Sequence, residues 1–562
     1  MAFQLSPGVN VSEIDLTTIV PSVATSIGAF AGPFAWGPVG EIITISDEVR
    51  LASTFGNPDS TNYEYWFSAA NFLAYTSNLK IVRAVNITTT RNATANGGNN
   101  VVLIRNEEDW EENFSSGNTA FGIAFARYAG AIGNTLRVSA SDANTHSAWI
   151  YSSLFTSAPG TSTYVSNKGG TFDELHVVVI DEDGLFSGTR GTVLEKFPFV
   201  SKASDAKDDS GNNNFYKEVI ANKSKYIQWA SHPTTISTGT AWGSTANASA
   251  FANLTANVLS SLSGGVDGTI STANVVTAYD FFNNAEAVDI SLIVSGPSDA
   301  STIPNALITT AEARKDCVVF LSPPKSNCVD NAGSETTNIK TYRDTLTSTS
   351  YAVLDSNWKY QYDKYNDVYR WVPLNGDVAG LCARTDLERD PWFSPGGLNR
   401  GIIKNSIKLA WNPTKTNRDD LYVKGINPIV TFQGEGTVLF GDKTLLSKPS
   451  AFDRINVRRL FIVLEKAIAR AARFSLFEYN DQFTRAQFVA LVEPFLRDVQ
   501  GRRGITDFRV VCDETNNTGE VIDRNEFIGD IYIKPARSIN FIQLNFVAVR
   551  TGVSFDEVVG QF

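Results

Sequence analysis

The sequence predicts a multidomain protein that combines α/β and α+β domains. Its length of 562 residues is enough for about three or four domains, each with its own core. A hydrophobic content of 43% and a charged content of 19% are typical of a folded, soluble chain. Apolar residues recur at helical spacing in some stretches and alternate in others, so both helices and strands are expected.

One polar stretch sets the expected domain order. Residues rich in Ser, Thr, Gly and Asn begin near Asn86 and end near Asp267, with α/β patterns on both sides. We therefore predict a domain that is interrupted by an insertion. The expected parts are an N-terminal arm (1–20), a middle α/β domain (21–87 and 268–380), a β-rich insertion (88–267), a C-terminal α+β domain (381–549) and a C-terminal arm (550–562).

The N-terminal arm contains one short strand pattern. Ser6-Pro7-Gly8 signals a turn, and apolar and polar residues alternate after it. Pro21 separates this pattern from the next one. A strand without a neighbour in the sequence has to find its partner elsewhere, on another subunit if need be. The residues expected to make this pairing are Val9, Val11, Ser12 and Ile14.

The middle domain shows the strand–helix alternation of an α/β fold. Before the insertion, strands are predicted at 23–30, 41–45 and 79–85, with an aromatic-rich helix at 63–75. After it, helices are predicted at 273–283 and 302–315, and strands at 290–294 and 317–321. The aromatic and charged stretch 358–371 is either a hairpin or a loop. Within the insertion, 175–180 reads as a short strand between turns.

The C-terminal domain begins with two helical patterns. The first is a basic helix with an apolar stripe of Leu460, Phe461, Leu464, Ala467, Ile468, Ala471 and Phe474. The second has capping-box spacing at Thr484 and Gln487, and its stripe consists of Phe488, Leu491, Val492, Phe495, Leu496 and Val499. Pro494 is expected to kink this helix, and Gly501 and Gly504 to end it.

The period then changes to that of strands. Phe508, Val510 and Cys512 alternate with polar residues, 530–534 reads as a second strand, and 540–548 continues the alternation. Two helices against a small sheet form an α+β unit. The last strand-like pattern, with Val553, Phe555 and Val558, has no following partner. We expect it to add to the sheet of another subunit.

Charge and cysteine content exclude several classes of protein. A net charge of −11 argues against general nucleic-acid binding. Residues 451–510 run against this trend, with eleven Lys/Arg and seven Asp/Glu. They form either solvated helix faces or a basic face that meets an acidic partner. The four cysteines have no CxxC spacing, which favours reduced thiols. No signal peptide is recognisable, and prolines interrupt the uncharged stretch 16–40, so direct membrane insertion is not expected.

Motifs for catalysis or cofactor binding are absent from the sequence. The three histidines, His146, His176 and His232, have neither nucleophile nor metal-ligand spacing. The stretch 436–444 resembles a phosphate loop, but Asp442 would repel a phosphate, so we interpret it as a turn between strands. The acidic stretches 181–184 and 208–211 lack the glycine and glutamate of calcium loops. We therefore predict no catalytic residue, no cofactor and no metal.

Several short motifs, in their order along the chain, resemble one family. They are Ser6-Pro7-Gly8-Val9-Asn10-Val11-Ser12-Glu13, the Gly-x-x-Gly-Asn element in 126–134, 262–268, 313–317, Ser322-Pro323-Pro324 and Val457-Arg458-Arg459-Leu460-Phe461. Together they resemble the contractile tail sheath proteins of myophages, and the polar insertion is similar to that of the larger, T4-type members.

The resemblance implies a structural protein of the phage tail. It implies hexameric rings stacked as a helix around a tail tube, with the C-terminal domain innermost and the insertion outermost. It implies assembly in the host cytoplasm, contacts with the tube, baseplate and tail terminator proteins, and contraction that drives the tube through the host envelope. The alternatives are the sheath of a tailocin or type VI-like system, or a subtilisin-fold hydrolase.

The resemblance also assigns the middle domain and the arms. The middle domain would be subtilisin-like in fold; only Gly160-Thr161-Ser162 matches an element of that protease triad, so no activity is carried over. The arms would join a sheet shared between subunits, accepted by Phe508, Val510, Ile542, Leu544 and Phe546. Arg497, Arg502 and Arg503 are candidates for a basic face towards the tube; the alternative is plain C-terminal helix charges favoured by the dipole.

Overall fold

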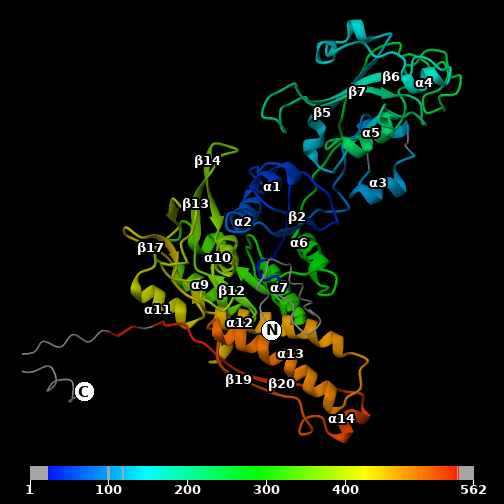
Figure 1. Ribbon diagram of the computed structural model, residues 1–562. Helices are drawn as coiled ribbons and strands as arrows, with labels where there is room; N and C mark the ends of the chain where they lie inside the picture. Colours follow the sequence, from blue (N-terminus) through cyan, green and yellow to red (C-terminus); the bar gives the residue numbers. More distant parts are fainter. Residues whose placement is uncertain (1–22, 98–101, 117–118, 541, 544–562) are drawn as a thin grey trace, which may run out of the picture. The chain divides into compact units, whose positions relative to one another are not determined.

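The computed structural model describes residues 23–97, 102–116, 119–540 and 542–543 (Figure 1). These residues divide into two compact units, 23–470 and 471–543, which we call the body and the C-terminal unit. Both predicted arms lie outside the described residues. The body contains the middle domain and the insertion, and the two units are described separately below.

A seven-stranded sheet organises the body. Its order is β16-β12-β11-β10-β1-β3-β2, and all neighbours are parallel except β2 and β3. The three strands that precede the insertion lie at one side of this order and the four that follow it at the other, with β1 beside β10, so both parts of the interrupted α/β domain share one sheet. The strands are β1 (Gly28–Gly32), β2 (Ile43–Ile45), β3 (Leu79–Arg83), β10 (Leu292–Val294), β11 (Val318–Leu321), β12 (Ala352–Asp355) and β16 (Ile426–Asn427).

Helices cover both faces of this sheet. Alternate strand residues supply two separate cores, for example Phe30 and Phe320 to one and Ala29 and Val319 to the other. The first core contains α1 (Glu48–Phe55), α2 (Tyr63–Leu73) and α10 (Asn375–Glu388). The second contains α6 (Thr272–Tyr279), α7 (Thr302–Arg314), α9 (Glu335–Asp344) and α11 (Lys415–Val423). The short helix α8 (Lys325–Cys328) follows β11.

The predicted boundary between residues 380 and 381 is wrong. It falls inside α10, whose residues pack against α2, and it separates β16 from the sheet to which β16 belongs. The helix has little apolar periodicity, because two of its positions are glycines that allow neighbouring atoms to approach closely. A Cβ at Gly376 would lie 2.2 Å from the Ser68 carbonyl oxygen, and one at Gly380 would lie 2.4 Å from the Tyr75 ring. The α/β domain therefore continues well beyond residue 380.

Small antiparallel sheets complete the body. The stretch 358–371 is a hairpin, with β13 (Trp358–Asp363) between β14 (Val368–Pro373) and β15 (Lys408–Leu409). A second pair is formed by β17 (Ile429–Phe432) and β18 (Gly436–Leu439). The interpretation of 436–444 as a turn is therefore wrong for its first four residues. Asp442 forms an ion pair with Arg454 (2.7 Å), so its carboxylate serves the fold.

The insertion is built on an antiparallel sheet of order β7-β6-β5-β9. Its strands are β5 (Leu136–Asp142), β6 (Glu174–Asp181), β7 (Thr192–Ser201) and β9 (Val258–Ser261), and β4 (Ala124–Ala126) pairs with β8 (Ile227–Trp229). Three short helices accompany them: α3 (Glu107–Asn113), α4 (Thr163–Asn167) and α5 (Tyr216–Lys223). The core includes an ion pair between Lys202 and Asp142 (2.9 Å), both fully buried.

Helix α12 (Ile455–Ala472) ends the body, and α13 (Gln482–Gly501) begins the regular part of the C-terminal unit. The N-cap of α13 is Asp481, which accepts the Thr484 N–H at 2.8 Å, so the predicted start at Thr484 is three residues late. Pro494 lies inside the helix. The unit is completed by β19 (Ile505–Val511), α14 (Gly519–Asp523) and β20 (Asp530–Pro535).

Candidate assembly surface

The C-terminal unit presents a two-stranded antiparallel sheet on one helix. Phe508 pairs with Ile533 and Val510 with Ile531, and these four half-buried side chains share one face. That face packs on the buried stripe of α13, which consists of Phe488, Val492, Leu496 and Val499. On the opposite face, Lys534 forms an exposed ion pair with Asp507 (2.9 Å).

In the described part of the chain, both strands of this sheet keep one open edge. Among the described residues, β19 pairs with β20 alone and β20 with β19 alone. The Phe508 N–H donates to the Asp507 carboxylate at 3.0 Å, which indicates that Phe508 and alternate residues direct backbone groups away from β20. The side chains of Phe508 and Val510 hold the sheet on α13, while their backbone lies at the edge.

Ile542 has no strand partner among the described residues, so its place in the sheet that accepts the arms stays a prediction. The N–H of Ala536 still donates to the Gly504 carbonyl at 3.1 Å, but residues 537–540 and 542–543 form no strand. Ile542 is 79% exposed because nothing in the described chain lies opposite it. Leu544 and Phe546 lie outside the described residues, as do Val9, Val11, Ser12, Ile14, Val553, Phe555 and Val558 of the arms.

The three candidate arginines lie at the C-terminal end of α13 and are exposed. Arg497 pairs with Glu493 at 3.1 Å and Arg502 with Asp498 at 3.7 Å, each one turn back on the same helix. Arg503 follows the helix with a φ of 68°. Exposed pairs of this kind contribute less than about 1 kcal/mol, so they leave the arginines able to meet an acidic partner. Both predicted roles remain open.

Several of the basic side chains in 451–510 form ion pairs within the body. Arg459 forms a buried ion pair with Asp386 (2.7 Å), and Arg470 pairs with Asp289 (2.8 Å), which also contacts Lys466. Burial raises the pKa of Asp386, against the opposing effect of Arg459. The sequence could not reveal these pairs, because the carboxylates stand 73 and 181 residues away.

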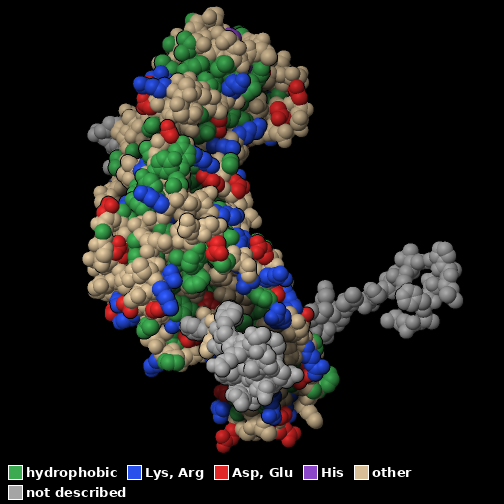
Figure 2. All heavy atoms as spheres, turned by 90° about the vertical axis from the view of Figure 1, so that its left-hand side faces the viewer, with side chains coloured by type: hydrophobic (Ala, Val, Ile, Leu, Met, Phe, Trp, Pro, Cys, Tyr) green, Lys and Arg blue, Asp and Glu red, His purple; other side chains and the backbone are tan. Residues whose placement is uncertain are grey.

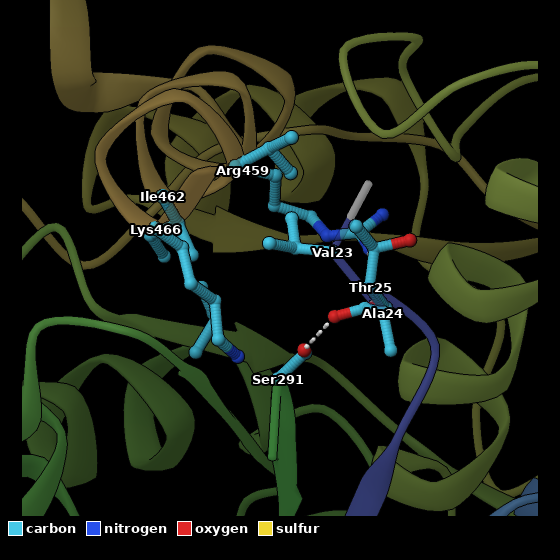
Figure 3. A pocket seen from close by; sticks show the side chains of 9 residues that line it. Val23, Ala24, Thr25, Ser291, Arg459, Ile462 and Lys466 are labelled. Carbon is cyan, nitrogen blue, oxygen red and sulfur yellow. Dashed lines mark hydrogen bonds between the residues drawn. The ribbon is translucent and has the colours of Figure 1, made fainter. Parts of the chain in front are cut away.

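The first described residues are held against α12 (Figure 3). Val23, Ala24 and Thr25 line a small pocket with Arg459, Ile462 and Lys466. Ser291 Oγ donates to the Ala24 carbonyl at 3.0 Å, and Arg459 Nη2 donates to the Thr25 carbonyl at 3.3 Å. The chain is thus fixed at this point, three residues before β1.

Two of the groups considered for chemistry, Asp181 and His176, have roles in the fold. The Asp181 carboxylate accepts hydrogen bonds from the backbone N–H groups of Gly184, Leu185, Phe186 and Ser187. These hydrogen bonds occupy the oxygens that a calcium site would need. His176 is buried and stacks on Phe155. In the described part of the chain, no cluster of three His, Cys, Asp or Glu residues could hold a metal ion. Nor does that part contain a helix with the length and hydropathy of a membrane span.

Known proteins match this chain over almost its whole length. Residues 268–445 match the phage tail sheath protein central domain, and 447–548 the phage tail sheath C-terminal domain. The chain is 34% identical to the tail sheath protein of Vibrio phage KVP40, with 99% of this chain and 100% of the relative covered. It is also 34% identical to the tail sheath protein of Enterobacteria phage T4, with 99% of both covered.

A solved structure agrees with the fold. The helical sheath of the anti-feeding prophage, in its contracted state, matches with a TM-score of 0.51 and 13% identity, over 97% of this chain and 99% of that chain. At this identity the likeness concerns the fold alone. Tail sheath proteins are structural and not enzymes. The chain belongs to the phage tail sheath protein family.

Proposed function

We propose that this chain is the subunit of a contractile phage tail sheath, which polymerises as stacked hexameric rings around the tail tube. The terminal arms exchange strands between subunits, and contraction drives the tube through the host envelope. The protein acts in the virion after assembly in the host cytoplasm, and its partners are other copies of itself, the tube, the baseplate and the tail terminator.

One observation carries this proposal within the sheath family: in the described part of the chain, β19 and β20 form a sheet of two strands with an open edge on each side. The chain also has two strand-like arms, one at each terminus. An arm of about six residues added to such an edge makes roughly four to six hydrogen bonds, each worth about 1 kcal/mol net. Two arms and two edges per subunit fit a sheet in which each copy receives strands from its neighbours.

The two units would have different positions and roles in the sheath. We assign the C-terminal unit to the inner side, where Arg497, Arg502 and Arg503 would meet an acidic tube surface. The α/β part of the body would be a non-catalytic, subtilisin-like domain, and the insertion (88–267) would lie outermost. Since the sequence lacks a phosphate loop, the energy for contraction would be stored in the extended sheath during assembly.

A sheath of a tailocin or type VI-like injection system is the second candidate, favoured by the likeness in fold to the anti-feeding prophage sheath. A subtilisin-fold hydrolase is disfavoured, because Gly160-Thr161-Ser162 lies in the insertion without the other triad elements.

Negative-stain microscopy of the purified chain tests the proposal. Full-length protein is compared with a variant lacking residues 1–18 and 550–562. We expect tubes or rings from the full-length chain and folded monomers from the truncated one. If both stay monomeric even after tube protein is added, the assembly function is wrong. If both assemble equally well, the arms do not link the subunits.

A further inference from the structure

The hairpin β13–β14 buries polar side chains and exposes aromatic ones. Its inward residues are Lys359, Gln361 and Asp363, all nearly inaccessible. Lys359 Nζ lies 2.9 Å from Asp377, Asn71 Nδ2 donates to Gln361 at 3.0 Å, and Arg370 Nε donates to Asp363 at 2.8 Å. A hairpin at the surface of a protein ordinarily shows the reverse pattern, so the outer face calls for an explanation.

That outer face is a continuous aromatic surface, made of Tyr360, Tyr362, Tyr369 and Trp371, which we call the aromatic face. Tyr360 stacks on Tyr369 with ring centroids 5.6 Å apart and contacts Trp371 at 4.7 Å, while Tyr362 meets Tyr369 at 5.3 Å. Lys408 Nζ lies 5.0 Å from the Tyr360 ring and 5.5 Å from the Trp371 ring, and it has no carboxylate partner among the described residues. At the other end of the face, the Tyr362 hydroxyl donates to Asp367 at 2.7 Å. The surface is therefore aromatic, with a lysine at one end that has no ion-pair partner in the described chain.

Figure 1 draws β13, β14 and β17 on its left-hand side, the side that Figure 2 views. In Figure 2, hydrophobic side chains reach the surface in groups among interspersed charges. Tyr362 and Tyr369 are about half exposed, at 45% and 54%. Grouped apolar side chains at a protein surface mark sites of association.

The C-terminal unit carries a second apolar surface, residues 473–483, which run from the end of α12 into the first turn of α13 and which we call the aromatic loop. Its exposed large side chains are Phe474, Leu476, Phe477, Tyr479 and Phe483. Phe477 has a φ of 71° and is fully exposed, so the loop presents it outward at a conformational cost. Glu478 beside it is exposed and has no cationic partner among the described residues.

We propose that the aromatic loop of one copy docks on the aromatic face of a second copy, with Glu478 against Lys408. Both surfaces are rich in aromatic side chains, and Lys408 and Glu478, which have no ion-pair partner among the described residues, carry opposite charges. Because they are different patches of one chain, the contact is heterologous and adds subunits without closing a pair. The inference rests on the proposed self-assembly and adds an interface besides the exchanged arms.

Cysteine cross-linking of assembled protein tests the contact. One preparation carries Phe477→Cys and a second carries Tyr369→Cys; the four native cysteines are buried. After mixing, assembly and mild oxidation, we expect a disulfide-linked dimer. In a matched control, Ile150→Cys in the insertion, 75% exposed, replaces Tyr369→Cys and should give no dimer. Assemblies without the dimer, or with equal dimer from the control, overturn the inference while the sheath function stands.

A charge exchange supplies the second test. Glu478→Lys and Lys408→Glu should each raise the concentration for half-maximal assembly about fivefold, and the double variant should return it to the original value. Both side chains are exposed, so the melting temperature should stay unchanged as a control for folding. Absence of rescue overturns the pairing. Normal assembly of Glu478→Lys with lost binding to tube protein would instead identify the tube as the occupant of the loop. If the unaltered chain does not assemble at all, both the proposed function and this inference are wrong.

Discussion

The body and the C-terminal unit differ in how the edges of their sheets are protected. In the body, helices cover both faces of the central sheet, and its edge strands β2 and β16 have only three and two residues. In the C-terminal unit, the sheet has two strands of seven and six residues, each with one edge that has no partner strand among the described residues. Short or covered edges prevent unwanted pairing, whereas long open edges invite it. The two sheets therefore differ in how much of their edge the described chain leaves for a further strand.

The body contains a buried carboxyl group, so the stability of the body is expected to depend on pH. In the body, burial raises the pKa of Asp355 to about 8. Between pH 4 and 8 the unfolded carboxyl is ionised while the folded one keeps its proton, so the free energy of unfolding falls as pH rises, by roughly 5 kcal/mol at most. Calorimetry should show the body transition moving down in temperature over this range, and Asp355→Asn should flatten the dependence. An unchanged slope in the variant would contradict the assignment.

The buried ion pair of α12 should be the next most costly to break. Arg459→Ala leaves Asp386 buried without its cation, at a cost of about 3–5 kcal/mol to the body in urea unfolding. The control is Lys424→Ala, which breaks the exposed pair with Asp344 and should cost less than about 1 kcal/mol. Arg459→Met combined with Asp386→Leu should recover most of the loss. Equal effects of both single variants would show that burial does not matter here.

A core truncation in α13 should act on the C-terminal unit alone. Leu496 is fully buried, and Leu496→Ala should cost about 3 kcal/mol of that unit's stability and weaken assembly, with the body transition unchanged. The matched control, Leu387→Ala on α10, removes a leucine that is 67% exposed and should change neither. One common transition that shifts in the Leu496 variant would mean that the units unfold together, and the comparison drawn above would fail.

The smallest effect on stability is expected at the end of α13. Charge reversal of Arg497, Arg502 and Arg503 to Glu should change the unfolding free energy by less than about 1 kcal/mol, because their pairs are exposed. Assembly around tube protein should nevertheless be lost. Lys223→Glu, on an exposed position of the insertion, serves as a control. If the triple variant still assembles on the tube, the arginines are ordinary C-terminal helix charges.

The sequence predicted the parts of the fold that depend on local patterns. Apolar stripes located α12 and α13, alternation located β19 and β20, and the α/β pattern on both sides of the insertion located α2, α7, β3 and β11. Helix α10 was missed because Gly376 and Gly380 allow close contacts with Ser68 of α2 and with Tyr75 just after it, which no local pattern shows. Its omission misplaced the domain boundary.

The candidate site was predictable only in part, for the same reason. The alternation that reveals a strand also locates Phe508 and Val510, but it continues into Ile542, where no partner strand exists in the described chain. The partners of Arg459 and Lys466 come from distant segments, so local charge counting mistook an internal network for a surface. The stretch 358–371 was predicted as a hairpin or a loop, but its sequence does not show which of its residues are buried by Asn71 and Asp377.

The place where the N-terminal segment leaves the body has a mechanical consequence. Residues 23–25 lead directly into β1, which lies between β3 and β10 in parallel register. A pull on the segment therefore acts along the strand axis and strains the hydrogen bonds to both neighbours together, instead of opening them one by one. The Ser291 and Arg459 contacts at Ala24 and Thr25 meet the force first. Tension passed from one subunit to the next would thus reach the middle of the sheet and move the α/β core as one piece.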